Sequence, residues 1–245
     1  MIASSDGIQR GSTGVPNAAG AETSFRETAL TARHRIPSGF EFGVRVPWVD
    51  IHAEEKGSPD ENLSGIGDVA VFGEKEIGAG FRGVVGCKLP TGDEKASPKP
   101  GVIPPSLLQV GTGTFDPFVG FGWRAATGST LWSAGGLWQL PIGESDASLA
   151  PGQVLQLQFA AGQTLSDELT ASLGLEALFR GHDELLGNEL AGTGSSIWSV
   201  TPGLSWAVGE NTSLDVLARI PIETQVNRTQ VVPGILVHFG LSWRF

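Results

Sequence analysis

Apolar and polar residues alternate along most of this chain, and this period of two constrains the fold more than any other feature. The alternation is clearest in GILVHFGLSWRF (234–245), where every residue of one parity is apolar: Ile235, Val237, Phe239, Leu241, Trp243 and Phe245. Because successive side chains of a strand point to opposite faces, this row predicts a strand with one apolar face. The row runs up to the last residue, whereas terminal residues of most domains are loose and polar. The whole segment is therefore expected to be needed for pairing.

The same alternation returns in many other segments of the chain. It is clear in 40–48, 81–89, 115–124, 132–140, 155–163, 169–179, 198–208 and 214–220. Two further candidates are weaker, because 25–36 is rich in Arg and His and 66–77 fits either register. With the C-terminal segment the reading gives about eleven strands, each near the roughly 9–11 residues that cross a bilayer at a steep tilt.

The connections between these segments alternate in length. Short connections are expected at 37–39, 76–80, 127–128, 164–168 and 209–212, and long ones at 50–64, 90–114, 141–152, 181–194 and 223–233. This is typical of an all-β, up-and-down antiparallel transmembrane β-barrel, with short turns on one rim and long loops on the other. Bacterial single-chain barrels have an even number of strands. We therefore expect about twelve, the first being either irregular within residues 1–20 or N-terminal to Met1 with a signal peptide.

Composition decides which face of the barrel is apolar. Only 17% of the residues are charged, which is too few to cover a soluble surface if the apolar rows pointed inward. The alternative is a soluble β-sandwich or solenoid. A net charge of −10 argues against nucleic acid as a partner. The predicted organisation is an irregular segment over residues 1–22 and a barrel over residues 23–245, facing outer-membrane lipid and monomeric.

The polar row carries the charged residues that are predicted to line the lumen. They are Glu41, Arg45, Arg82, Lys88, Asp116, Arg124, Glu176, Arg180, Asp215, Arg219, His238 and Arg244. Because both signs occur, cross-strand pairing inside the barrel is expected. Two interpretations stay open at this stage. The charges either fill and rigidify a narrow interior or line a path for small solutes, since about twelve strands lie between a filled barrel and an open porin.

All seven tryptophans lie on the apolar row or near predicted strand ends. They are Trp48, Trp123, Trp132, Trp138, Trp198, Trp206 and Trp243. This placement predicts an interfacial aromatic belt. The final residue, Phe245, is predicted to act as an assembly signal that the barrel-assembly machinery reads.

The sequence offers no constellation for catalysis or metal binding. The four histidines have no ligand spacing, and the single Cys87 excludes an internal disulfide and Cys-based metal sites. His238 and Ser242 share a face, but along one strand they lie about 13 Å apart, too far for a nucleophile and its base. We therefore predict no catalytic residue, no metal and no cofactor, and hence no enzyme.

Four motifs, in order, carry a resemblance to a known family: SGIGDVAVFGEKEI (64–77), CKLPTGDEK (87–95), VGTGTFDPFVGFGW (110–123) and VTPGLSWAVGENTSL (200–214). The set resembles the outer-membrane family labelled for the MetA pathway of phenol degradation, over roughly residues 25–245. It departs from the family in having no Tyr, no visible signal sequence and no clear first strand.

The resemblance implies a barrel in the outer membrane of a Gram-negative cell. The expected function is a passive channel or uptake transporter for small compounds, hydrophobic and aromatic ones included. The alternative is a plugged structural or surface-interaction barrel without transport. Loop 90–114 is the expected constriction, with Gly111, Thr112 and Gly113 allowing it to fold back into the barrel mouth.

Deleting Phe245 tests the role of the terminal strand. We expect a sharp fall in outer-membrane assembly, because a closed barrel requires its last strand to pair over its full length. The measurement is a denaturing gel, on which the folded, unboiled barrel migrates faster than the boiled protein. An unchanged amount of the fast-migrating form would contradict the prediction.

Overall fold

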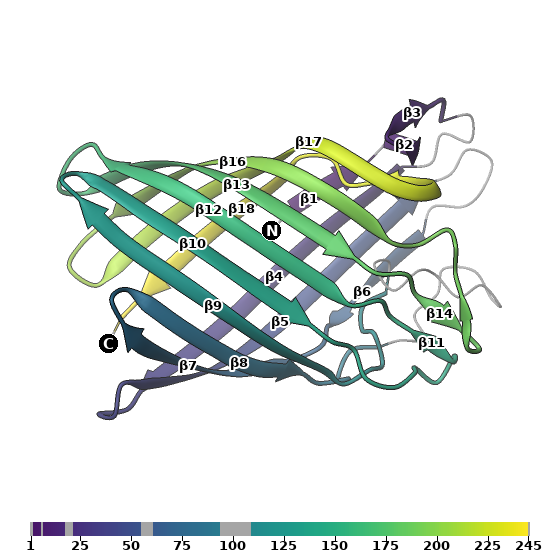
Figure 1. Cartoon of the computed structure of the whole chain (residues 1–245), viewed down its shortest axis with the longest axis horizontal. Helices are drawn as coiled ribbons and strands as arrows, with labels where there is room; N and C mark the ends of the chain where they lie inside the picture. The colour runs from purple at the N-terminus through teal and green to yellow at the C-terminus, as the bar shows by residue number, and fades with distance from the viewer. Residues whose placement is uncertain (1, 6, 18–21, 55–60, 94–108, 245) are drawn as a thin grey trace.

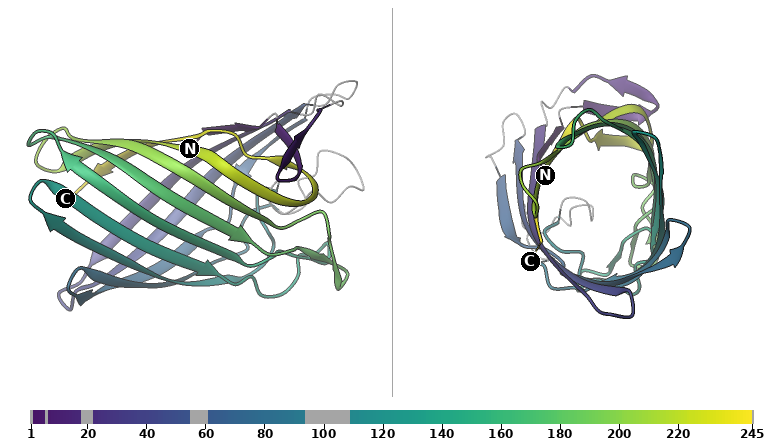
Figure 2. Two further views of the ribbon diagram at one scale, coloured as in Figure 1. Left: turned by 45° about the horizontal axis from the view of Figure 1, so that its top comes forward. Right: turned by 90° about the vertical axis from the view of Figure 1, so that its left-hand side faces the viewer.

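The computed structural model describes residues 2–5, 7–17, 22–54, 61–93 and 109–244 (Figure 1). One antiparallel sheet closes on itself into a barrel, and Figure 2 shows the ring of strands end on. Eleven long strands cross the barrel. They are β4 (Glu22–Arg35), β5 (Phe40–Glu54), β7 (Ala70–Gly78), β8 (Phe81–Lys88), β9 (Asp116–Thr127), β10 (Thr130–Gln139), β12 (Val154–Thr164), β13 (Leu169–Arg180), β16 (Ser195–Ala207), β17 (Thr212–Val232) and β18 (Leu236–Trp243).

A short twelfth strand closes the ring near the N-terminus. β1 (Ile2–Ser5) pairs with β4 on one side and β18 on the other, with Ile2 opposite Arg26 and Val237. The path from β1 through β4 to β16 then returns through β17 to β18. The predicted up-and-down barrel of about twelve strands is thereby confirmed, with its first strand lying within residues 1–20.

The two neighbours of β1 are paired with it over only part of their length. The printed pairings reach Arg26 on β4 and Val237 on β18. Beyond Ile2, toward the short-turn rim, residues 27–35 of β4 and 238–243 of β18 therefore have no strand between them within the described residues. Along this stretch β4 is exposed from Thr28 to Arg35, and Leu30 is 75% exposed.

The apolar rows face outward. On the last strand Phe239, Leu241 and Trp243 are 62%, 71% and 67% exposed, respectively. On β5 the outward Val44 is 43% exposed, whereas Gly43 on the other face is buried. An outer surface this rich in large apolar side chains suits hydrocarbon rather than water, because soluble monomers rarely expose contiguous apolar patches of this size.

Two of the predicted long loops are partly extended strands. β5 continues to Glu54 and pairs with β6 (Glu61–Ile66), while the 21-residue β17 runs to Val232 and pairs with β2 (Gly7–Gly11). β2 in turn pairs with β3 (Thr13–Val15). The alternation of apolar residues does not predict this extension. A hairpin that lies beyond the membrane keeps its backbone hydrogen bonds and needs no apolar face. The loops 141–152 and 181–194 add a small sheet of β11 (Leu149–Ala150), β14 (Glu184–Leu185) and β15 (Asn188–Glu189).

The described apolar core is small and lies inside the long-loop half of the barrel. Val49 and Ile51 of β5 pack against Val110, and Phe25 and Leu63 cover this cluster. Val110 belongs to the connection between β8 and β9, and the described end of this connection, residues 109–115, turns inward and packs against the inner wall. Most of the constriction expected at 90–114 lies outside the described residues. No helix long and apolar enough to cross a membrane occurs in the described part of the chain.

A pair of arginine substitutions on neighbouring residues tests the assignment of faces. Leu175, near the middle of β13, is 41% exposed, and Gly174 faces the lumen. We expect Leu175→Arg to lower the free energy of unfolding by about 2–4 kcal/mol, the cost of Arg on the lipid face near the midplane.

Gly174→Arg is the matched control. A Cβ at Gly174 would meet its nearest atoms at 3.4 Å, an ordinary contact, so we expect little change. Unfolding by urea in detergent measures both variants. Equal losses for the two would show that the faces are misassigned.

Candidate functional site

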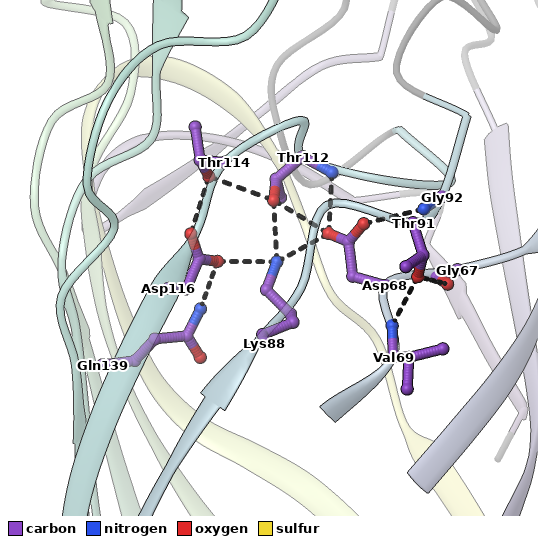
Figure 3. Close-up of polar contacts among 10 residues, drawn as sticks. All are labelled: Gly67, Asp68, Val69, Lys88, Thr91, Gly92, Thr112, Thr114, Asp116 and Gln139. Atoms are coloured by element: carbon purple, nitrogen blue, oxygen red, sulfur yellow. Dashed lines mark hydrogen bonds and ion pairs between the residues drawn. The ribbon is translucent and has the colours of Figure 1, made fainter. Parts of the chain in front are cut away.

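A buried carboxylate organises the long-loop half of the lumen (Figure 3). Asp68 precedes β7 and is 7% exposed. Its Oδ1 accepts from the backbone N–H of Gly92 at 3.0 Å, and its Oδ2 accepts from the backbone N–H of Thr112 at 2.9 Å and from the Thr112 hydroxyl at 2.8 Å. The Asp68 side chain, between β6 and β7, thus binds both described ends of the connection between β8 and β9: Gly92 shortly after β8 and Thr112 shortly before β9.

Lys88 joins this carboxylate to a second one. Its Nζ lies 2.9 Å from Asp68 Oδ2 and 2.7 Å from Asp116 Oδ2, and it donates to the Thr112 hydroxyl at 2.8 Å. Asp116 is fully buried and also accepts from Thr114 and Gln139, at 2.6 Å and 2.9 Å. We name Asp68, Lys88, Thr112, Thr114, Asp116 and Gln139 the loop latch. Because each buried charge in it has several partners, it stabilises one position of the inward connection.

Three glycines let the backbones of these segments meet. A Cβ on Gly111 would lie 2.6 Å from the Cα of Gly92, and a Cβ on Gly92 would lie 2.7 Å from the Cα of Gly111 and 3.0 Å from the carbonyl carbon of Gly67. No real side chain tolerates such distances to backbone, so only glycine fits at 92 and 111. The glycines of G-x-G-D, L-P-T-G-D and G-T-G-x-x-D therefore serve one contact.

The acidity of Asp68 follows from its surroundings. Burial alone would raise the pKa of its carboxyl, but the charge and hydrogen bond of Lys88, with the N–H groups of Thr112 and Gly92, hold the pKa below its ordinary value. Its stabilising contribution is present above the unfolded pKa and is lost as the pH falls through the lower folded pKa. The Asp68 carboxylate therefore stays charged in acid in which a free Asp is already protonated.

The short-turn half of the lumen contains a separate charged cluster. The guanidinium of Arg33 lies 3.3 Å from both Glu41 and Glu74, two carboxylates on directly paired strand positions. Arg82 adds a 2.7 Å contact to the other oxygen of Glu74, and Arg35 binds Glu41 at 3.2 Å. Arg33 thus separates two like charges that would otherwise repel each other across the strands.

The far wall of the barrel has its own polar contacts. Arg219 on β17 binds Glu176 on β13 at 2.5 Å, and Glu176 also accepts from the Thr201 hydroxyl at 3.0 Å. Near the long-loop rim Arg180 binds the fully buried Asp183 at 2.9 Å. Asp183 also accepts from the backbone N–H of Gly152. The contacts of Asp183 with Arg180 and Gly152 hold loops 141–152 and 181–194 against the barrel.

Beside the cluster of Arg33, Glu41, Glu74 and Arg82 lies a cavity of about 610 Å³. Its lining comes from β4, β7, β8, β9, β10 and β12 and includes Arg33, Glu74, Arg82 and Arg124. It reaches the turn between β7 and β8 at Gly80, so it occupies the short-turn half of the lumen. The barrel interior therefore has two parts: a latched connection toward the long-loop rim and an open chamber toward the short-turn rim.

The twelve residues predicted to line the lumen are distributed over these groups. Lys88 with Asp116 and Glu176 with Arg219 form pairs within the predicted set. Arg45, Glu41, Arg82 and Arg180 pair instead with residues that the sequence analysis did not select, namely Glu27, Arg33, Arg35, Glu74 and Asp183. No ion pair of Arg124, Asp215, His238 or Arg244 is seen in the described residues.

The sequence carried a usable signal for the residues that were missed. Arg33, Arg35 and Glu74 lie on the two weakest predicted strands, and pairing them with the clear strand 40–48 would have fixed their parity. Asp68 and Thr112 lie outside strands, so periodicity says nothing about them. Only the recurrence of glycine next to Asp or Thr in three motifs pointed to them.

The tryptophans lie toward both ends of their strands. Trp123, Trp132, Trp206 and Trp243 are toward the short-turn rim, and Trp48, Trp138 and Trp198 are toward the long loops. On β16, Trp198 and Trp206 are eight positions apart, which corresponds to roughly 26 Å along the strand. The role of these residues as a membrane belt stays a prediction, and Phe245 lies outside the described residues. Within those residues no group of three or more His, Cys, Asp and Glu is placed to hold a metal.

The fold and the lumen are those of an outer-membrane β-barrel. The family model described as MetA-pathway of phenol degradation matches residues 11–239. This chain belongs to that family. No curated protein matches it.

Two solved structures share the fold. The crystal structure of an outer membrane channel from Pseudomonas putida F1 has a TM-score of 0.73 at 9% identity, covering 98% of this chain and 92% of the channel. The beta domain of the Bordetella autotransporter BrkA has a TM-score of 0.55 at 13% identity, covering 100% of this chain and 97% of that domain. Together with the exposed apolar rows, they place the protein in the outer membrane.

Replacing Lys88 tests the loop latch. Lys88→Met leaves the carboxylates of Asp68 and Asp116 close together without a cation, and breaking a buried pair in this way costs about 3–5 kcal/mol. We expect the lower end of that range in the free energy of unfolding, because the Lys88 side chain is 21% exposed. Urea unfolding in detergent measures it.

Lys75→Met is the matched control. Lys75 is exposed and lies over the ring of Phe40 on the outer face, where removal of its charge should have a much smaller effect. An equal loss in both variants would mean that the latch contributes nothing beyond a surface lysine.

Proposed function

We propose that the protein is a passive channel for small compounds, hydrophobic and aromatic ones included, across the outer membrane. The observation that carries this proposal is the chamber of about 610 Å³ in the lumen. Its volume lies in the range of sites that hold small molecules. A barrel that served only as a scaffold would have little reason to keep so large a volume free of side chains.

The wall of the lumen suits solutes that have both apolar and polar parts. Phe72, Val84, Phe118 and Leu137 alternate with the charged inward residues on β7 to β10 and are only partly exposed. The guanidinium of Arg33 lies 5.2 Å from the centre of the Phe72 ring. A solute that is partly apolar therefore finds apolar surface between the charged groups, as in most small-molecule sites.

The loop latch favours the alternative function, a plugged structural or surface-interaction barrel. Asp116 and Asp68 are buried and fully paired, and Val110 packs into a small core. Such a plug stays in place unless its ion pairs break. The two functions therefore differ in whether solute passes the latched connection or the connection closes the lumen permanently.

Conductance of the purified protein in planar bilayers separates the two functions. We expect small, stepwise single-channel currents, because the latched connection narrows the long-loop half while the chamber stays open. Lys88→Met should raise the conductance, since it releases the connection from Asp68 and Asp116. Lys75→Met should leave it unchanged.

Correct folding is verified on the same samples by the faster migration of unboiled protein. If the folded wild type and folded Lys88→Met are both silent, the channel function is wrong and the plugged barrel is supported.

A further inference from the structure

The chamber has an unusual floor, which the strand register defines. Arg82, Gly122, Gly135 and Gln158 are successive neighbours across β8, β9, β10 and β12, and they form one row on the inner face. With neighbouring strands about 4.8 Å apart, the two ends of this row are roughly 14 Å from each other. Two glycines thus lie side by side between two long polar side chains.

The glycine floor is open at Gly122, whereas the Gln158 side chain lies over Gly135. A Cβ added to Gly122 would meet no atom within 4 Å. Over Gly135 the nearest atom is Nε2 of Gln158, 3.1 Å from the added Cβ position. The open backbone at Gly122 is a surface on which a planar group can lie, beside the Gln158 amide that covers Gly135.

The next row adds further hydrogen-bond donors. Arg124 and Ser133 are direct cross-strand partners on β9 and β10, and both line the chamber. The turn between β7 and β8 fixes the backbone here, because Arg124 N–H donates to the Gly80 carbonyl at 2.9 Å. Gly80 has a φ of +79°, and a Cβ there would lie 2.0 Å from the Arg124 carbonyl oxygen. Only glycine allows this approach, so the position of Arg124 is built into the fold.

Within the part of the chain that the structure describes, these donors have no partner. In the described residues, the side chains of Arg124, Ser133 and Gln158 make no hydrogen bond or ion pair. Arg82 and Arg33, in contrast, are both committed to Glu74. The lining carries three arginines against the two carboxylates of Glu74 and Glu76. Glu41, which Arg33 also binds, adds a third carboxylate, and Arg124 is the lining arginine for which no ion pair is seen in the described residues.

We propose that this chamber is a binding site for planar organic carboxylates, with Arg124 binding the carboxylate, Ser133 and Gln158 donating further hydrogen bonds, and the ring lying on the open backbone at Gly122. Guanidinium groups match carboxylates in geometry and charge. The inference rests on the proposed channel function, since it names the class of solute that the lumen takes. It narrows that class from small compounds in general to flat anions.

Binding of 4-fluorobenzoate to the folded barrel in detergent tests the proposal without any measurement of conduction. Fluorine NMR detects bound probe by line broadening, with empty micelles as the blank. We expect saturable binding by the wild type. Competition with benzoate should displace the probe, whereas benzamide and acetate should not, because the first lacks the charge and the second lacks the ring.

Three variants locate the site. Arg124→Gln should weaken binding about tenfold or more, the usual effect of losing a charged hydrogen bond. Gly122→Leu should abolish binding by filling the floor without changing any charge. Arg26→Gln is the matched control and should bind as the wild type does, because Arg26 is exposed on the outer face.

The proposal is wrong if the folded wild type does not bind the probe, if Arg124→Gln binds it unchanged, or if acetate or benzamide competes as well as benzoate. These outcomes are independent of the bilayer experiment. A barrel that conducts but does not bind benzoate overturns only this inference. A barrel that binds benzoate but never conducts overturns only the proposed function.

Discussion

Backbone hydrogen bonding in a solvent without water is the constraint on which the whole structure depends. Within hydrocarbon every N–H and C=O has to find a partner in the protein, and a sheet achieves this only by closing into a ring. Closure fixes the outward and inward faces, because side chains alternate along every strand. The apolar rows then lie against lipid, and all charged chemistry gathers on the inside. Here β1 completes the ring toward the long-loop rim, and the lumen is polar because the strands form this ring and not because of any local motif.

Inside the ring, glycine does two different things. Between segments, Gly92 and Gly111 remove side chains so that backbones can touch, which brings Thr112 to Asp68. On the wall, Gly122 lacks a side chain so that space remains, and Gly135 leaves room for the Gln158 side chain. The first use closes one half of the lumen and the second opens the other half. A barrel of this size therefore acquires a narrow part and a wide part without any change in strand number.

Much of the fold could be predicted from the sequence, and the reason is physical. A period of two over 40–48 or 169–179 predicts a strand with one apolar face. The low share of charged residues in the sequence then indicates that this face points outward. The inward turn of the loop around Gly111 was also predicted. The partners of the charged residues were not. Arg33 and Glu74 lie on strands whose polar residues occupy both faces, so parity could not place them. Asp68 and Asp116 meet through a lysine on a third segment, and such a contact depends on the packing of loops, which no periodicity encodes.

The loop latch also bears on how the polypeptide reaches its final shape. It links Asp68 to Asp116 through Lys88, all within one run of consecutive strands from β7 to β9. The contact that completes the ring instead joins Ile2 to Val237, almost the whole length of the chain. Since the entropic cost of bringing two points together grows with the chain between them, the three-strand unit with its inward loop has the lower barrier. Ring closure at β1 is then expected to be the last step, made around an interior in which Asp68, Lys88 and Asp116 are already joined.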